Sequence, residues 1–221
     1  MLSEFMTFIQ SIVSAIITPS FCMYCKLFSD YIEVFCDTCR EKIKPIVSVE
    51  LRITQDVNVK VFALSEYKDP LKKLILAKGS ADIIASHQLG KLLFDMPQIK
   101  LLESDVIVPI PLHWSRYAWR GYNQAQEIAQ VIGKQKNDPV IDLLKRVKRT
   151  TLQSEVAHFQ RPENVKNAFS LSSDKGQKYK NKHILLIDDL MTTGSTLRSA
   201  TKELLKLKPK SITAAVVCRV K

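Results

Sequence analysis

The chain has 221 residues, of which 46% are hydrophobic and 25% are charged, and these fractions exclude a disordered or fibrous protein. Lysine and arginine outnumber aspartate and glutamate, for a formal net charge of +11. The excess favours polyanionic partners such as nucleic acid, nucleotides or an acidic membrane surface, although it also fits a role in solubility alone.

The first predicted element is an amphipathic helix over residues 5–17. Its hydrophobic side chains recur at helical spacing: Phe5, Ile9, Ile12, Val13, Ile16 and Ile17. The segment is short for a membrane span, and no basic stretch precedes it as in a signal peptide. We expect this helix to pack on the body of a cytoplasmic protein. Peripheral contact with the inner face of the membrane is the alternative.

Four of the five cysteines form two Cys-x-x-Cys pairs with ten residues between them: Cys22, Cys25, Cys36 and Cys39. Four thiolates at two such turns complete a tetrahedral zinc site. Two disulfides or a redox pair are the alternatives. However, a redox pair needs no duplicate, and a cytosolic setting disfavours disulfides. The spacing therefore predicts structural zinc, whereas Cys218 is expected to be a buried strand residue.

The rest of the chain alternates between predicted strands and helices. Strands are expected at 57–64, 105–110, 184–187 and 212–220, and helices at 69–77, 83–94, 124–132 and 197–207. This alternation predicts an α/β fold with a mostly parallel sheet, whose ligands bind at the carboxyl ends of the strands. We expect two domains: residues 1–50 hold the first helix and the cysteine element, and residues 51–221 hold the sheet.

Two polar loops follow predicted strands. The first, from Pro109 to Gln124, contains Arg116 and Arg120. Arginine forks bind phosphate or pyrophosphate oxygens in a bidentate way, although two arginines at this spacing also occur on a solvated helix face. His113 is the one side chain of the two loops that titrates near neutral pH, and a structural role is favoured for it.

The second loop combines two carboxylates with a cluster of hydroxyl groups. Asp188 and Asp189 follow an apolar run, and then come Thr192, Thr193, Gly194, Ser195 and Thr196 at the start of a predicted helix. Hydroxyls, backbone N–H groups and the positive end of a helix dipole suit an anion. The carboxylates suit neighbouring hydroxyls or a divalent cation, so a ribose 5-phosphate fits both halves. An ordinary helix cap is the alternative, but it explains one hydroxyl and not four.

This second loop resembles the 5-phosphoribosyl-1-pyrophosphate (PRPP) motif of type I phosphoribosyltransferases. In order with the four cysteines and the Arg-Gly-Tyr-Asn-Gln run at 120–124, it makes the chain similar to the ComF (ComFC) competence-protein family. A Gln…Arg-x-x-Asn…Ala-Phe stretch also matches, at Gln153, Arg161, Asn164, Ala168 and Phe169. Two positions depart from the pattern: Gly79 follows Lys78 where an aromatic is expected, and Cys218 precedes Arg219 where a small residue is expected.

The resemblance implies a phosphoribosyltransferase fold that binds PRPP with Mg²⁺ and serves DNA uptake in natural transformation. By the resemblance, Asp188 and Asp189 face the ribose hydroxyls, and residues 192–196 cradle the 5-phosphate. The first loop holds the pyrophosphate through Pro111, His113, Arg116, Arg120 and Gly121. Catalysis does not follow from the fold, which hosts ligand sensors as readily as enzymes.

Single-stranded DNA is the second expected partner. The predicted contacts are basic side chains beside aromatic platforms: Lys145, Arg146, Lys148 and Arg149, with Trp114 and Trp119. The alternative is an active phosphoribosyltransferase of nucleotide metabolism, for which no catalytic residue stands out. A further possibility is that the cysteine element docks proteins of the DNA-uptake machinery.

Overall fold

The computed structural model describes residues 21–28, 34–76, 81–112, 117, 121–147, 168–172 and 176–220. The chain divides into two compact units, Met1–Ile43 and Lys44–Lys221. The helix predicted over residues 5–17 lies outside the described residues. Among the described residues, no helix combines the length and apolar character that a membrane span requires.

In the first unit, residues 21–28 and 34–43 are described. Its one described helix is α2 (Asp37–Arg40), and a single β-bridge joins Phe21 to Phe28. The described buried residues are Val34, Phe35 and two of the cysteines, Cys22 and Cys39. Half of the described buried side chains of this unit are therefore thiols.

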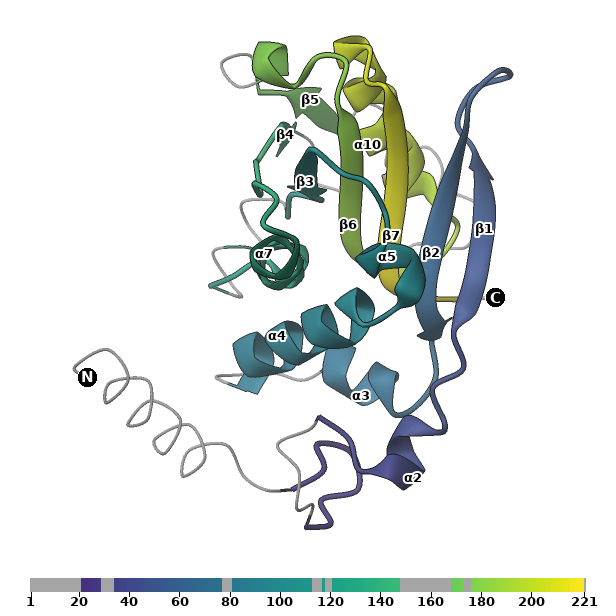
Figure 1. The fold of residues 1–221 in the computed structure, drawn as a ribbon, viewed down its shortest axis with the longest axis vertical. Coiled ribbons are helices and arrows are strands. Elements are labelled where there is room, and N and C mark those ends of the chain that lie inside the picture. The colour runs from purple at the N-terminus through teal and green to yellow at the C-terminus, as the bar shows by residue number, and fades with distance from the viewer. Residues whose placement is uncertain are drawn as a thin grey trace, which may run out of the picture. The chain divides into compact units, whose positions relative to one another are not determined.

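The second unit is built on a five-stranded sheet with the order β1-β2-β7-β6-β3 (Figure 1). Its strands are β1 (Ile46–Arg52), β2 (Asn58–Glu66), β3 (Val106–Pro109), β6 (His183–Met191) and β7 (Ser211–Arg219). Only β1 is antiparallel to its neighbour. The predicted mostly parallel sheet is confirmed. Strand β1 was not predicted.

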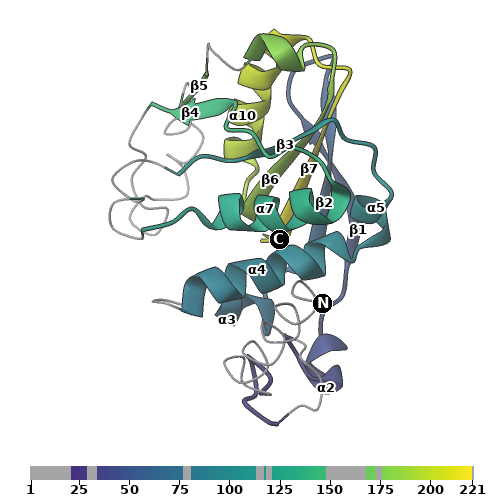
Figure 2. The ribbon, with the colours of Figure 1, turned by 60° about the vertical axis from the view of Figure 1, so that its left-hand side comes forward.

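Helices cover both faces of this sheet (Figure 2). The described helices are α3 (Leu71–Ile75), α4 (Ala81–Phe94), α5 (Pro97–Lys100), α7 (Gln124–Lys136) and α10 (Ser195–Leu204), with 3₁₀ turns at Gln177–Tyr179 and Leu205–Leu207. Helices α3, α4 and α7 pack on one face. Helix α10 packs on the other, because Leu197 and Leu204 meet Ile184 and Leu186 of β6. Successive strand residues point to opposite faces, and both faces are covered, so the middle of β6 (184–187) and the end of β7 (214–218) are continuous buried apolar runs.

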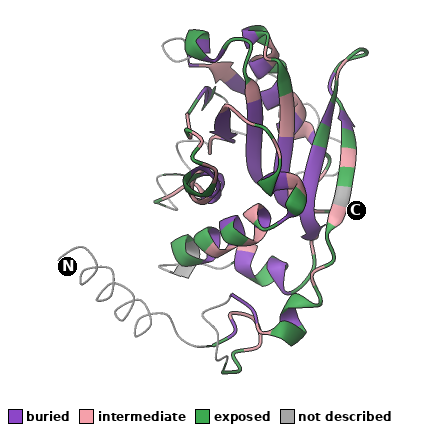
Figure 3. Ribbon diagram, in the orientation of Figure 1, coloured by how far each residue is buried: buried purple, intermediate pink, exposed green. Residues whose placement is uncertain are grey.

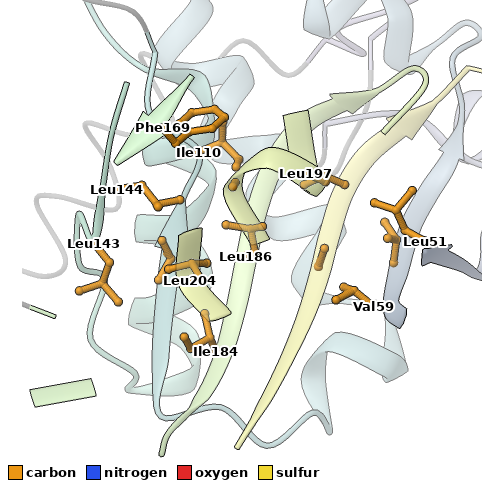
Figure 4. Close-up of a cluster of buried hydrophobic side chains, with 14 of the residues drawn as sticks. Leu51, Val59, Ile110, Leu143, Leu144, Phe169, Ile184, Leu186, Leu197 and Leu204 are labelled. Carbon is orange, nitrogen blue, oxygen red and sulfur yellow. The ribbon is translucent and has the colours of Figure 1, made fainter. Parts of the chain in front are cut away.

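The hydrophobic core beneath α10 positions the candidate site. It joins the central strands to α10 and to a small antiparallel ladder, formed by β4 (Leu144–Arg146) and β5 (Phe169–Leu171) (Figure 4). Figure 3 shows the central strands as buried over most of their length. The Val147 N–H donates to the Ala168 carbonyl at 2.8 Å. The two chain ends that flank residues 148–167 therefore lie side by side.

Candidate functional site

The two polar loops leave the same edge of the sheet. Strands β3 and β6 are parallel neighbours, with Pro109 opposite Ile187, and the Ile110 N–H donates to the Ile187 carbonyl at 2.8 Å. The carboxyl ends of β2 and β7 lie at that edge too, since these strands are parallel to β6. The edge therefore brings together the chain segments that the sequence predicted to bind a ligand.

The paired carboxylates lie within β6 rather than in the loop after it. Strand β6 continues to Met191, and Asp188 pairs with Val216 of β7. Asp188 is 8% exposed and its Oδ1 accepts the Asp189 N–H at 3.0 Å. Burial raises the pKa of Asp188 well above its usual value, and the adjacent Asp189 carboxylate raises it further. An ionised pair here is costly without a ligand or cation between the carboxylates.

Among the described residues, Arg146 of β4 contributes a positive charge that acts on Asp188. Its field lowers the pKa of Asp188, although burial and Asp189 outweigh it. The Arg146 guanidinium lies over the Phe169 ring of β5, 5.4 Å from the ring centroid. Its neighbour Lys145 is exposed. The sequence analysis predicted these two residues to form one DNA-binding cluster. In β4, however, successive side chains point to opposite sides, so Lys145 faces solvent and Arg146 faces Phe169.

Gly194 opens α10 in a left-handed conformation, with φ of +75°. Its carbonyl accepts the first helical bond, from the Arg198 N–H at 2.9 Å, and no side chain caps the helix. The Thr193 and Ser195 hydroxyls lie 2.7 Å apart, and Thr192, Ser195 and Thr196 are half-buried. This arrangement leaves first-turn N–H groups and several hydroxyls beside the carboxylate pair, which is the composition of an anion site.

The ends of the first loop are tied together. The Asn123 side-chain amide donates to the Ile110 carbonyl at 3.0 Å, and Gly121 has φ of +79°. Pro111 is half-buried at the start of the loop. The remaining predicted residues lie outside the described residues: His113, Trp114, Arg116, Trp119 and Arg120. Asn123 belongs to the Arg-Gly-Tyr-Asn-Gln run of the sequence, and its side chain bonds to Ile110 rather than capping α7, so it is a positioning residue of the loop.

A tyrosine from β2's carboxyl end reaches the same edge. The Tyr67 N–H donates to the Arg219 carbonyl at 2.8 Å. Burial raises the pKa of Tyr67, and Cys218 and Asp189 raise it further. Cys218 is fully buried on β7, as predicted, and burial followed by the Asp189 charge raises its pKa to about 12. Tyr67 therefore belongs to the surroundings of the carboxylate pair.

The four cysteines of the first unit form a candidate metal centre. All four Sγ atoms lie within 4.8 Å of one another, and Cys25 Sγ is 3.7 Å from Cys36 Sγ. Four sulfurs about 2.3 Å from a tetrahedral zinc would lie roughly 3.8 Å apart, whereas a disulfide is about 2.05 Å long. All four are free thiols. These cysteines are positioned to bind a metal ion.

Backbone N–H groups around the cluster favour the thiolate form of Cys22, which is the form that binds a metal cation. Burial opposes ionisation of Cys22, but backbone N–H groups of Cys25, Cys36 and Tyr24 outweigh it and lower the pKa of Cys22 to about 6. Burial and the other three thiols raise the pKa of Cys39 to about 12. A bound cation removes the mutual repulsion that otherwise keeps one of the thiols protonated.

Comparison with known proteins gives consistent matches. Residues 117–221 match the phosphoribosyl transferase domain. The chain is 35% identical over 157 residues to competence protein F of Haemophilus influenzae, covering 67% of each chain. It is 28% identical over 211 residues to DNA utilization protein YhgH of Salmonella typhimurium, covering 90% of this chain and 84% of that one. It is 33% identical over 120 residues to competence protein ComFC of Bacillus subtilis, covering 52% and 44%. The predicted phosphoribosyltransferase-like fold is confirmed.

Proposed function

The chain belongs to the competence protein F (ComF) family, and we propose that it is a DNA-uptake protein that binds PRPP with Mg²⁺ and acts on incoming single-stranded DNA in the cytoplasm. The names of its relatives, competence protein and DNA utilization protein, support the biological role. The phosphoribosyl transferase match supports the ligand.

One observation supports PRPP most strongly: a helix start with no side-chain cap and with a hydroxyl-rich first turn lies directly after the buried Asp188 and the half-buried Asp189. The 5-phosphate of PRPP would take the N–H groups of residues 194–197 and the hydroxyls around them. Asp188 and Asp189 would accept hydrogen bonds from the ribose hydroxyls. The first loop follows the neighbouring strand β3, at a suitable place for the pyrophosphate.

Two metal ions fit the residues present. Mg²⁺ prefers carboxylate and phosphate oxygens, so the Asp188 and Asp189 carboxylates would hold it together with PRPP, and its charge would reduce the repulsion between the carboxylates and the ligand. Zinc suits the four thiols of the first unit and would add stability to a part of the chain whose described residues bury few apolar side chains. We propose that the zinc stabilises the first unit and takes no part in binding PRPP.

The test of PRPP binding is a thermal shift with PRPP and Mg²⁺, because a ligand that binds only the native state raises the melting temperature. The double variant Asp188→Ala/Asp189→Ala should fold and show no shift. Asp56→Ala/Asp95→Ala removes two exposed carboxylates elsewhere and should keep the shift. If PRPP stabilises both double variants equally, the assigned role of the Asp188–Asp189 pair is wrong.

The DNA proposal now separates two residues that the sequence grouped together. Lys145 is exposed on β4, and its charge is available to a phosphate backbone. Arg146 lies over Phe169 with its charge acting on Asp188, so we assign it to the PRPP pocket. Lys148, Arg149, Trp114 and Trp119 remain proposed DNA contacts on sequence grounds, outside the described residues.

The matched pair Lys145→Gln and Arg146→Gln tests this division, since each variant loses one positive charge from the same strand. Lys145→Gln should reduce the salt dependence of single-stranded DNA binding by about 0.7 in log–log slope for one lost phosphate contact. Arg146→Gln should leave that slope unchanged and weaken PRPP binding. The opposite result would return Arg146 to the DNA surface. Absence of any DNA binding at low salt would remove DNA from the proposal.

The second candidate is an active phosphoribosyltransferase, favoured by the domain match over residues 117–221. In that reaction the bond from ribose C1 to pyrophosphate breaks and a bond from C1 to the acceptor forms, while the acceptor loses a proton to water or buffer. The protein would contribute positioning and stabilisation of the departing charge. Release of pyrophosphate on incubation with PRPP, Mg²⁺ and a panel of bases would establish it.

A further inference from the structure

Arg198 links the hydroxyl-rich loop to the edge strand of the sheet. From the first turn of α10, its Nη1 donates to the Thr193 carbonyl at 2.7 Å and its Nε donates to the Arg52 carbonyl at 3.0 Å. Both acceptors are backbone groups, one in the loop and one at the end of β1. A planar guanidinium has its donors in a fixed fork, so these two bonds hold the two carbonyls in one geometry.

The bond to Thr193 determines the orientation of a donor in the phosphate loop. In a trans peptide the C=O and N–H groups point in opposite directions. Holding the Thr193 carbonyl toward Arg198 therefore directs the Gly194 N–H away from Arg198. If this peptide flipped, the loop would present a carbonyl oxygen where it now presents an N–H group. A phosphate would then meet a negative partial charge in place of a donor.

Strand β1 also lies against this glycine. A Cβ atom added to Gly194 would lie 2.6 Å from Leu51 Cδ1 and 3.6 Å from Arg198 Nη1. The Leu51 side chain and the Arg198 guanidinium thus both lie beside Gly194, and Leu51 leaves no room there for a Cβ atom. The antiparallel strand β1 takes part in these contacts through Leu51 and the Arg52 carbonyl.

We propose that Arg198 is a positioning residue for the 5-phosphate site. Through its two carbonyl bonds it holds the Thr193–Gly194 peptide with the Gly194 N–H available to the phosphate, and it uses β1 as the fixed support. The proposal rests on the proposed binding of PRPP. It concerns the phosphate end of that ligand and not its pyrophosphate end.

The experiment compares ligand fragments by calorimetry, in the presence of Mg²⁺, on the full chain. Arg198→Gln should weaken PRPP and ribose 5-phosphate by about tenfold, the effect of roughly one hydrogen bond, and leave pyrophosphate binding unchanged. Arg198→Lys keeps the charge but loses the forked guanidinium, so its affinity for PRPP and ribose 5-phosphate should fall almost as much. Lys202→Gln, an exposed charge one turn later on the same helix, is the control and should bind like the wild type.

Three results would overturn the proposal. Equal binding of ribose 5-phosphate to the wild type and Arg198→Gln would show that the peptide needs no such support. Full affinity in Arg198→Lys would show that charge, and not the fork, is what matters. Equal weakening of ribose 5-phosphate and pyrophosphate would indicate a general structural defect. If the wild type binds neither PRPP nor its fragments, the proposed function fails as well, which distinguishes the two failures.

Discussion

Replacing Gly194 by alanine should be far more costly than replacing Gly121 by alanine, although both glycines have nearly the same backbone conformation. Their φ values are +75° and +79°, so both substitutions place an L side chain in the left-handed region, at about 1–2 kcal/mol. Among the described residues, a Cβ at Gly121 would have no heavy atom within 4 Å, whereas one at Gly194 would lie 2.6 Å from Leu51. The forced repacking adds about 1–3 kcal/mol to Gly194→Ala alone.

Thermal denaturation measures the difference, because each kcal/mol lowers the melting temperature by about 2–4 °C in a unit of this size. The cause can be tested with Leu51→Ala, which on its own costs about 2–5 kcal/mol because Leu51 is buried. Combined with Gly194→Ala it should cost less than the sum, since the methyl group then has room. Equal losses for Gly121→Ala and Gly194→Ala, or strict additivity with Leu51→Ala, would refute the packing argument.

Three other outcomes are expected. The purified protein should contain about one zinc per chain, which Cys22→Ser should lose and Cys218→Ser should keep, as measured by metal analysis. Because the pKa of Asp188 is raised, its ionisation destabilises the folded state, and this loss begins as pH rises above about 3.8. Asparagine at this position cannot ionise, so Asp188→Asn should melt at a higher temperature than the ligand-free wild type at neutral pH. The difference in melting temperature should shrink toward pH 4. A lower melting temperature for Asp188→Asn at pH 7 would contradict this. The His183 N–H and Lys182 lower the pKa of Asp105, so the ionised carboxylate stabilises the folded state at neutral pH and this stabilisation is lost in acid. The melting temperature of Asp105→Asn should therefore fall less steeply below pH 4 than that of the wild type.

The loops at the carboxyl edge could be predicted because each follows an apolar strand and carries its own signal in consecutive residues. The cysteine cluster could be predicted for the same reason, since the spacing of the four cysteines in the sequence is enough to indicate it. Strand β1 was missed although its sequence carries a strand signal, since apolar Val47, Val49 and Leu51 alternate with polar Ser48, Glu50 and Arg52. What the sequence does not show is the packing of Leu51 on Gly194, because that contact joins segments far apart in the chain.

The surroundings of Arg146 in the candidate site could not be predicted from the sequence either. In the sequence it is one of several basic residues. Its surroundings depend on the three-residue strand β4, whose partner β5 comes much later in the chain. Only that pairing places the guanidinium over Phe169 and its charge near Asp188. Contacts of this kind cannot be read from periodicity, because each strand is too short to show one.

The hydrogen bond from Val147 to Ala168 has an evolutionary consequence. It holds both anchor points of the intervening stretch, so the scaffold does not depend on what is inserted between them. Closing a connection of twice the length costs only about 0.6 kcal/mol more. Selection can therefore lengthen, shorten or recompose residues 148–167 while β4, β5 and the carboxylate pair keep their places. Differences between relatives of the chain can accumulate in this stretch without rebuilding the fold.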